Sequence, residues 1–474
     1  MKTTNTRFLT KITLIATLGG LLFGYDTAVI SGTVGALKDF FILPKGLGEF
    51  DANSLLGFVV SSALIGSIIG GLSGGYIAKR MGRKKGMMLA AILFLISAIG
   101  SAVPEIGFAP IGEGSHLHIT QFIIFRVLGG IGVGLASMLA PMYIAEMAPA
   151  EKRGGLVSWN QFAIIFGMLI VYFVNYSIAT QGDEVWLNTV GWRLMFASEA
   201  IPAIIFLILL FFAPESSRWL ILNHREAEGL HILERINGKE RAGIILSEIK
   251  NSISHHVSAK VLSFGIGIII IGIMLSVFQQ FVGINVVLYY APEIFKNMGS
   301  STDTALLQTI IVGSINLLFT VVAIKTVDKY GRKPLQIIGA LGMAISMFAL
   351  GTFFYMESVG SMALIFMLTY VAAFALSWGP VTWVLLAEIF PNKIRGGALA
   401  IAVAAQWIAN YMVSWTFPMM NNSTYLTGAF HHGFAYWIYG IMGVFAAFFV
   451  WKFIPETKGK TLEGIEAIWE EKLH

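Results

Sequence analysis

The chain has no cysteine among its 474 residues, and only 12% of its residues are charged. The absence of cysteine excludes disulfides, thiol chemistry and cysteine metal sites. A soluble domain has about 25% charged residues, so the shortage of charge excludes an ordinary water-soluble surface. The hydrophobic share of 56% and the mean hydropathy of +0.74 indicate a polytopic membrane protein instead.

The excess of basic residues gives a net charge of +5 and a pI near 9.1. In a soluble chain this balance would suggest a nucleic-acid partner, but here the Lys and Arg residues are gathered in a few short loops. Such loops set the orientation of membrane proteins. We therefore expect a lipid bilayer and no nucleic acid as partner. The loop histidines His116, His118, His431 and His432 have no metal-ligand partner at helical spacing, so no metal site is expected.

Twelve hydrophobic stretches are long enough to cross the bilayer, which takes roughly 20 apolar residues. They predict an all-α membrane protein with twelve transmembrane helices. The first stretch lacks a small-residue cleavage site, so we expect a retained helix and not a signal peptide. The predicted spans are 12–34, 54–78, 86–104, 119–143, 155–179, 190–212, 261–291, 304–327, 334–355, 360–387, 396–420 and 432–453.

A polar segment, 214–260, separates a six-helix half at 1–213 from a second half at 261–454, and 455–474 forms a tail. Charged residues alternate with leucine and isoleucine in the segment, which predicts short amphipathic helices at the membrane surface. The basic loops follow even-numbered spans, while the opposite loops carry mainly Asp and Glu. Both termini and the segment are therefore expected to be cytoplasmic.

Three loop motifs recur in the same order in both halves. The pairs are 79–84 with 328–333, 145–155 with 387–397, and 214–216 with 455–457. This repetition predicts two homologous, pseudo-symmetric halves with a binding site near the midplane between them.

The repeated loops contain arginine and glutamate at fixed spacing. Glu146 with Arg153, and Glu388 with Arg395, offer ion pairs that form when the molecule opens outward and break when it opens inward. The alternative is that these cations only set topology. The predicted conformational latch comprises Arg83, Glu146, Arg153, Arg332, Glu388 and Arg395.

Asp26 is a carboxylate in the middle of the first span, with no cation near it in sequence. A charge at the bilayer centre costs on the order of 2.5–3.5 kcal/mol, so such an acid points to function. The other deeply placed charge that we expect is Arg126, in the fourth span. A protonatable acid beside a fixed cation suits proton-coupled transport. The alternative is a permanent structural pair in a passive carrier.

Three amides lie in the seventh span, where Gln279, Gln280 and Asn285 each need hydrogen-bond partners. Amides donate and accept without carrying charge, which suits the hydroxyls of a neutral sugar. Gly283 and Pro292 are expected to interrupt this helix. The alternative is hydrogen bonding between helices.

Further polar side chains occur in other spans. Gln161, Asn316 and Gln406 lie in spans five, eight and eleven, and Trp383 lies in span ten. The Trp383 indole would suit the apolar face of a pyranose ring.

The loop motifs, with 214–218 (PESSR) and the closing 455–459 (PETKG), resemble those of the sugar-porter branch of the major facilitator superfamily. The resemblance covers essentially the whole chain and implies alternating access. It also implies that an acid at Asp26 carries the proton. The sugar-binding residues that it implies are Gln161, Gln279, Gln280, Asn285, Trp383 and Gln406, with Tyr289 and Asn316 close by.

The expected function is import of one monosaccharide, D-xylose or another pentose, with one proton, and without a cofactor or enzymatic activity. The expected form is a monomer in the bacterial inner membrane. Met168 lies two turns past Gln161, where the resemblance implies a glutamine, so D-glucose remains open as substrate. The alternatives are a glucose- or galactose-type symporter, a passive facilitator or a sugar sensor that does not transport.

Overall fold

The computed structural model describes residues 5–112, 115–149, 152–254, 261–391 and 394–458, and within these ranges it contains helices and no strand. Twelve helical segments there are long and apolar enough to cross a membrane, which confirms the predicted number. The first six are α1 (Thr6–Val29), α3 (Glu49–Met81), α4 (Arg83–Ala102), α5 (Ile119–Met147), α6 (Arg153–Ala179), and α8 (Trp192–Ser198) with α9 (Ala200–Phe212). The second six are α13 (Ile266–Phe281) with α14 (Ile284–Tyr289), α16 (Thr302–Tyr330), α17 (Arg332–Tyr355), α18 (Ser361–Leu376) with α19 (Trp378–Ile389), α20 (Arg395–Asn421) and α22 (Phe434–Phe453).

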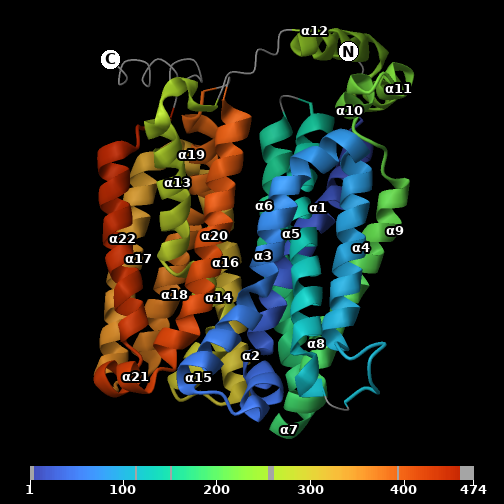
Figure 1. The fold of residues 1–474 in the computed structure, drawn as a ribbon. Coiled ribbons are helices and arrows are strands. Elements are labelled where there is room, and N and C mark those ends of the chain that lie inside the picture. The colour runs from blue at the N-terminus through green and yellow to red at the C-terminus, as the bar shows by residue number, and fades with distance from the viewer. Residues whose placement is uncertain (1–4, 113–114, 150–151, 255–260, 392–393, 459–474) are drawn as a thin grey trace.

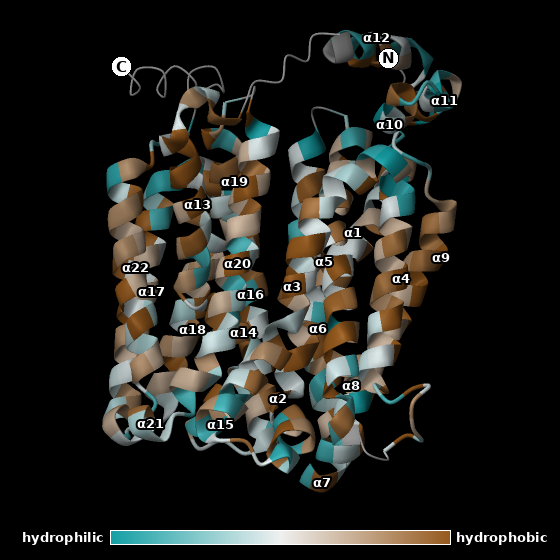
Figure 2. Cartoon of the chain, viewed as in Figure 1, coloured by the Kyte–Doolittle hydropathy of each residue, from teal (hydrophilic) through white to brown (hydrophobic). Residues whose placement is uncertain are grey.

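The two sets of spans form two bundles side by side, blue to green and yellow to red in Figure 1. In the first bundle, α3 and α4 pack on α5, and α1 packs on α6. In the second, α17 packs on α18 and α22, and α13 packs on α20. The bundles meet mainly where α3 lies on α20 and α6 lies on α16. Apolar residues cover the middle of both bundles, as the brown colour in Figure 2 shows.

Most spans are longer than the apolar stretches that predicted them. The second span, predicted at 54–78, runs from Glu49 to Met81. A helix continues past the hydrocarbon until its backbone is stopped, and here Gly82 stops it with a φ of +92°. Hydropathy therefore located the spans but not their ends.

Three spans are each built from two helices. Gly283 adopts a φ of +92° between α13 and α14, and a Cβ there would lie 2.7 Å from the Tyr439 ring, so only glycine fits. The interruption expected from Gly283 is therefore present. Pro292 lies in the first turn of α15 (Ala291–Asn297), where proline fits a helix. The breaks at Glu199 and Ser377 were not predicted from the sequence.

The linker between the halves forms three short helices, α10 (Ser217–Leu222), α11 (Glu226–Asn237) and α12 (Lys239–Ser254). They lie at one end of the molecule (Figure 1), which we call the basic end because α4 and α17 begin there with Arg-Lys pairs. The backbone N–H of Asn5 donates to the carbonyl of Ile236 at 2.9 Å, so α11 is attached to the start of α1.

The opposite end, called the far end below, carries four short helices: α2 (Val34–Leu37), α7 (Glu184–Trp186), α15 and α21 (Thr424–Phe430). Most of the predicted tail, 459–474, and linker residues 255–260 lie outside the described residues.

Candidate functional site

A buried ion pair joins α1 to α5 inside the first bundle. Arg126 Nη1 lies 2.8 Å from Asp26 Oδ1, and Arg126 Nη2 donates to the backbone carbonyl of Asp26 at 3.2 Å. The two side chains are 0% and 1% exposed. The structure therefore places Arg126 against Asp26, as the sequence analysis expected.

A third charged side chain, Glu199, corrects the expectation that Arg126 is the other deep charge. Glu199 lies at the break between α8 and α9 and is fully buried. It interacts electrostatically with both Asp26 and Arg126. No donor among the described residues hydrogen-bonds to either Glu199 oxygen or to Asp26 Oδ2, and the two carboxyls lie within hydrogen-bond reach of each other. The cluster thus contains one more acid than cation, so a single bound proton makes it neutral.

The sequence analysis did not single out Glu199, because it treated the sixth span as one long apolar run. That span also contains Arg193, but Arg193 pairs with Glu105 at 2.8 Å near the far end and leaves Glu199 to the Asp26 cluster. The sequence did contain a signal for Glu199, because the predicted span 190–212 holds two charged residues, Arg193 and Glu199.

The amides of the seventh span form a continuous hydrogen-bonded chain in the second bundle. Asn285 donates to the Gln280 side chain at 2.5 Å, and Gln280 donates to the Gln279 side chain at 3.4 Å. Gln279 in turn donates to the backbone carbonyl of Trp378 at 2.8 Å, next to the break in span ten. The broken backbone of α18 and α19 thus holds the end of the amide chain.

Tyr289 is held by α20, since Asn410 donates to its hydroxyl at 3.4 Å. Gln406 lies one turn earlier on α20, and its buried Oε1 has no hydrogen-bond partner among the described residues. This oxygen is available to a ligand hydroxyl.

The remaining candidate sugar contacts come from three other helices. Gln161 lies on α6, Asn316 on α16 and Trp383 on α19, and no hydrogen bond between described residues joins them to the amide chain. Trp383 is 37% exposed and so presents indole surface, whereas Asn316 is buried. Met168 on α6 is also buried.

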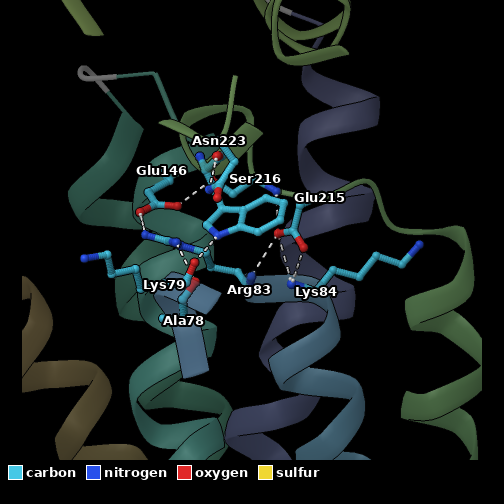
Figure 3. Close-up of polar contacts among 9 residues, drawn as sticks. Ala78, Lys79, Arg83, Lys84, Glu146, Glu215, Ser216 and Asn223 are labelled. Atoms are coloured by element: carbon cyan, nitrogen blue, oxygen red, sulfur yellow. Dashed lines mark hydrogen bonds and ion pairs between the residues drawn. The ribbon is translucent and has the colours of Figure 1, made fainter. Parts of the chain in front are cut away.

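At the basic end of the first bundle, Glu146 binds two partners (Figure 3). Arg83 Nη2 lies 2.6 Å from one of its oxygens, and the Ser216 hydroxyl donates to the other. Glu215 accepts from the backbone N–H groups of Arg83 and Lys84 at 2.9 and 3.1 Å, which caps the start of α4.

The second bundle repeats this network. Arg332 lies 2.9 Å from Glu388, and the Thr457 hydroxyl donates to Glu388 at 2.6 Å. Glu456 accepts from the backbone N–H groups of Arg332 and Lys333 at 3.1 and 3.0 Å. Glu215 and Glu456 were not among the predicted site residues, although the repeated Pro-Glu motifs pointed to them.

The other two latch arginines have different surroundings. Arg153 begins α6 and is exposed, whereas Arg395 donates to the backbone carbonyl of Phe390 at 3.2 Å. In this structure Glu146 pairs with Arg83, and Glu388 pairs with Arg332. The pairs Glu146–Arg153 and Glu388–Arg395 stay predictions for the opposite conformational state.

The hydrogen bonds that join the two halves, taken between described residues, lie away from the basic end. Asn53 on α3 donates to the carbonyl of Asn422 at 3.5 Å, and Trp415 on α20 donates to that of Ser54 at 3.1 Å. Glu49 accepts from the backbone N–H of Thr424 at 2.6 Å. Deeper between the halves, Tyr172 on α6 donates to the carbonyl of Leu288 on α14 at 3.0 Å. These contacts close the far end.

A family model described as "Sugar (and other) transporter" matches residues 12–469. The chain belongs to this family. Within it, the D-xylose-proton symporter of Escherichia coli is 64% identical, over 98% of this chain and 96% of that protein. The glucose facilitated diffusion protein of Zymomonas mobilis is 42% identical, over 98% of each chain.

A solved structure is similar as well. The inward-open conformation of the xylose transporter from Escherichia coli superposes with a TM-score of 0.89 at 62% identity, over 97% of this chain and all of that one. The chain is therefore a multi-pass sugar transporter with the major facilitator fold.

Proposed function

We propose that this transporter imports D-xylose together with protons across a bacterial inner membrane by alternating access. The observation that supports this most is the buried cluster of Asp26, Arg126 and Glu199, which is neutral only when it holds a proton. The relative with 64% identity is named as a D-xylose-proton symporter. A passive sugar carrier has no need of an intramembrane acid in excess over its cations.

The basic end faces the cytoplasm in this proposal, because Lys and Arg are enriched in cytoplasmic loops. The far end, where the hydrogen bonds between the halves gather, then faces outward and is closed. The structure is in that case an inward-facing state, which agrees with its likeness to the inward-open relative.

Sugar binds between the halves, against the amide chain of Gln279, Gln280 and Asn285. Trp383 packs on the apolar face of the ring, and Gln406 Oε1, which no described residue binds, accepts from a hydroxyl. Gln161 contributes from the first half, with Tyr289 and Asn316 close by. Because the two halves contribute separate contacts, a bound sugar favours the state in which they approach each other.

Protonation of the Asp26 cluster weakens the hold of Asp26 on Arg126 and so alters the packing of α1 against α5. A proton that moves through 100 mV supplies roughly 2.3 kcal/mol, enough for about fifty-fold accumulation of a neutral sugar. The networks around Glu146 and Glu388 hold the loops of each half together while the halves rock. The protein acts as a monomer, since each chain contains both halves.

The test is uptake of radiolabelled xylose and glucose into proteoliposomes, with and without an inward proton gradient, for wild type and Asp26→Asn. We expect gradient-dependent accumulation of xylose by wild type, and loss of accumulation with retained sugar exchange in Asp26→Asn. Equal downhill uptake with or without the gradient would identify a facilitator like the Zymomonas relative. Faster uptake of glucose than of xylose would keep the mechanism and replace the substrate.

A further inference from the structure

The buried serines of the first bundle divide into two groups. Ser61, Ser62 and Ser67 on α3 each donate to a carbonyl of their own helix, at 2.7, 2.8 and 3.1 Å. This is the usual arrangement of serine within a helix. Ser97 and Ser101 on α4 are equally buried, at 0% exposure, but their hydroxyls have no hydrogen-bond partner among the described residues. Unsatisfied buried groups are rare and call for an explanation.

Ser97 faces the proton site. A Cβ built on Gly129 would lie 2.3 Å from Ser97 Oγ and 3.1 Å from Asp26 Oδ1, so the two oxygens approach each other across the bare Cα of Gly129. Asp26 Oδ2 accepts from no donor among the residues described, and its carboxyl lies beside that of Glu199. The hydroxyl and the carboxyl are therefore within reach of each other through at most one bridging water.

Ser101 lies beyond Ser97 on α4, toward the far end of the molecule. It lies four residues after Ser97 on α4, so the two side chains share a face with about 5–6 Å between their Cβ atoms. The next residue, Ala102, has its carbonyl bound by Arg193 at 2.9 Å, and Arg193 pairs with Glu105 in the loop after α4. The Arg193 side chain is 10% exposed and so reaches the surface.

The two acids of the cluster, Asp26 and Glu199, have no contact with solvent in this structure. Asp26 and Glu199 are 0% exposed, so no water-sized probe reaches either from the space between the halves in this state. A proton that reaches them must pass through buried polar groups. The line from Arg193 and Glu105 through Ser101 and Ser97 consists of such groups and lies within one bundle, away from the sugar contacts on α13 and α20.

We propose that Ser101 and Ser97 form a proton path from the far end to Asp26, separate from the sugar pathway. A hydronium ion at the mouth gives its proton to a water held by Ser101. The hydroxyls and bound waters then pass protons along in a chain, each group gaining one and releasing one. The net result is a protonated carboxyl at Asp26 and neutral water at the mouth. This inference rests on the proposed proton symport.

The test compares Ser97→Ala and Ser101→Ala with Ser62→Ala, which removes an equally buried hydroxyl that its own helix already satisfies. Two rates are measured in proteoliposomes: xylose uptake driven by a proton gradient, and xylose exchange without net proton release. We expect gradient-driven uptake to fall about tenfold or more in Ser97→Ala, in line with the loss of a proton-transfer group. Exchange stays within about twofold of wild type. Ser101→Ala shows the same pattern.

Gly129→Ala is a second variant that removes no polar group. Its methyl would lie 2.3 Å from Ser97 Oγ, 2.8 Å from Ser97 Cβ and 3.1 Å from Asp26 Oδ1, so α4 must shift and carry the hydroxyl away from Asp26. We expect slower gradient-driven uptake while exchange continues. It keeps the proposal testable if Ser97→Ala does not fold. The proposal is overturned if the Ser97 variant behaves like Ser62→Ala, or if uptake and exchange fall together. A wild type without gradient-driven uptake would overturn the proposed symport itself.

Discussion

At the scale of single residues, Arg126 is the one cation beside the two buried acids Asp26 and Glu199. Removing one partner of a buried ion pair leaves an uncompensated charge and costs about 3–5 kcal/mol. We therefore expect Arg126→Leu to lower the Tm of the detergent-solubilised protein strongly, and to slow both sugar exchange and accumulation. Thermal unfolding monitored by tryptophan fluorescence measures the first effect.

The double variant Asp26→Asn/Arg126→Leu serves as the control. It removes both charges of the pair together, so neither is left without its partner, and Glu199 is the one charged side chain of the cluster that stays. We expect the double variant to regain most of the lost Tm. A double variant that is less stable than Arg126→Leu would contradict the assigned pairing of Asp26 with Arg126.

Asp26, Arg126 and the amides could be singled out from the sequence as candidate site residues, because each is a polar residue within an apolar run. Glu199 was not singled out, since its role depends on which of two charges in one span is satisfied elsewhere. The closeness of the Ser97 hydroxyl to Asp26 could not be predicted from the sequence, because it depends on how tightly α4 packs against Gly129 of α5.

At the scale of elements, Glu456 caps the first turn of α17. Burial alone would raise the pKa of Glu456, but backbone N–H groups of Lys458, Arg332 and Lys333 outweigh burial and hold the pKa below its ordinary value. A carboxyl with a lowered folded pKa stabilises the fold above its unfolded pKa, about 4.3. That contribution is lost as the pH falls through the folded pKa.

We therefore expect Glu456→Gln to lower the Tm at pH 7, by the equivalent of about 0.5–2 kcal/mol for a lost cap. The Tm difference between wild type and variant should shrink as the pH falls from 5 toward 3. The measurement is a series of thermal unfolding curves at these pH values. A Tm difference that stays constant over this range would show that the charge of Glu456 contributes nothing.

Helix ends and helix breaks are the features of this scale that the sequence predicted least well. The interruption at Gly283 was expected because glycine alone tolerates its backbone conformation. Ser377 has no such residue-level signal, and the residue that follows it, Trp378, is held by hydrogen bonds to two other helices. The Trp378 indole donates to the Gln336 carbonyl at 2.9 Å, and the Trp378 carbonyl binds Gln279.

At the scale of the whole molecule, transport requires the halves to separate at the far end and close at the basic end. The far end closes by backbone-to-backbone approach at Gly57 of α3, where a Cβ would lie 2.0 Å from the Trp415 carbonyl oxygen. A methyl group there cannot be relieved by a side-chain rotation. Gly57→Ala is therefore expected to shift the conformational equilibrium toward the state that is open at the far end.

Spin labels at the far ends of α3 and α20 should report this shift as a longer mean distance, with xylose transport about tenfold slower for each 1.4 kcal/mol of bias. Gly75→Ala, also on α3, is the matched control, since among the described residues a Cβ there meets only the Met138 methyl of α5, at 3.6 Å. Equal distance distributions in the two variants would mean that the far end relaxes around the added methyl. The closure would then depend on the polar contacts of Glu49 and Asn53 instead, because these are the contacts that remain when backbone approach is relaxed.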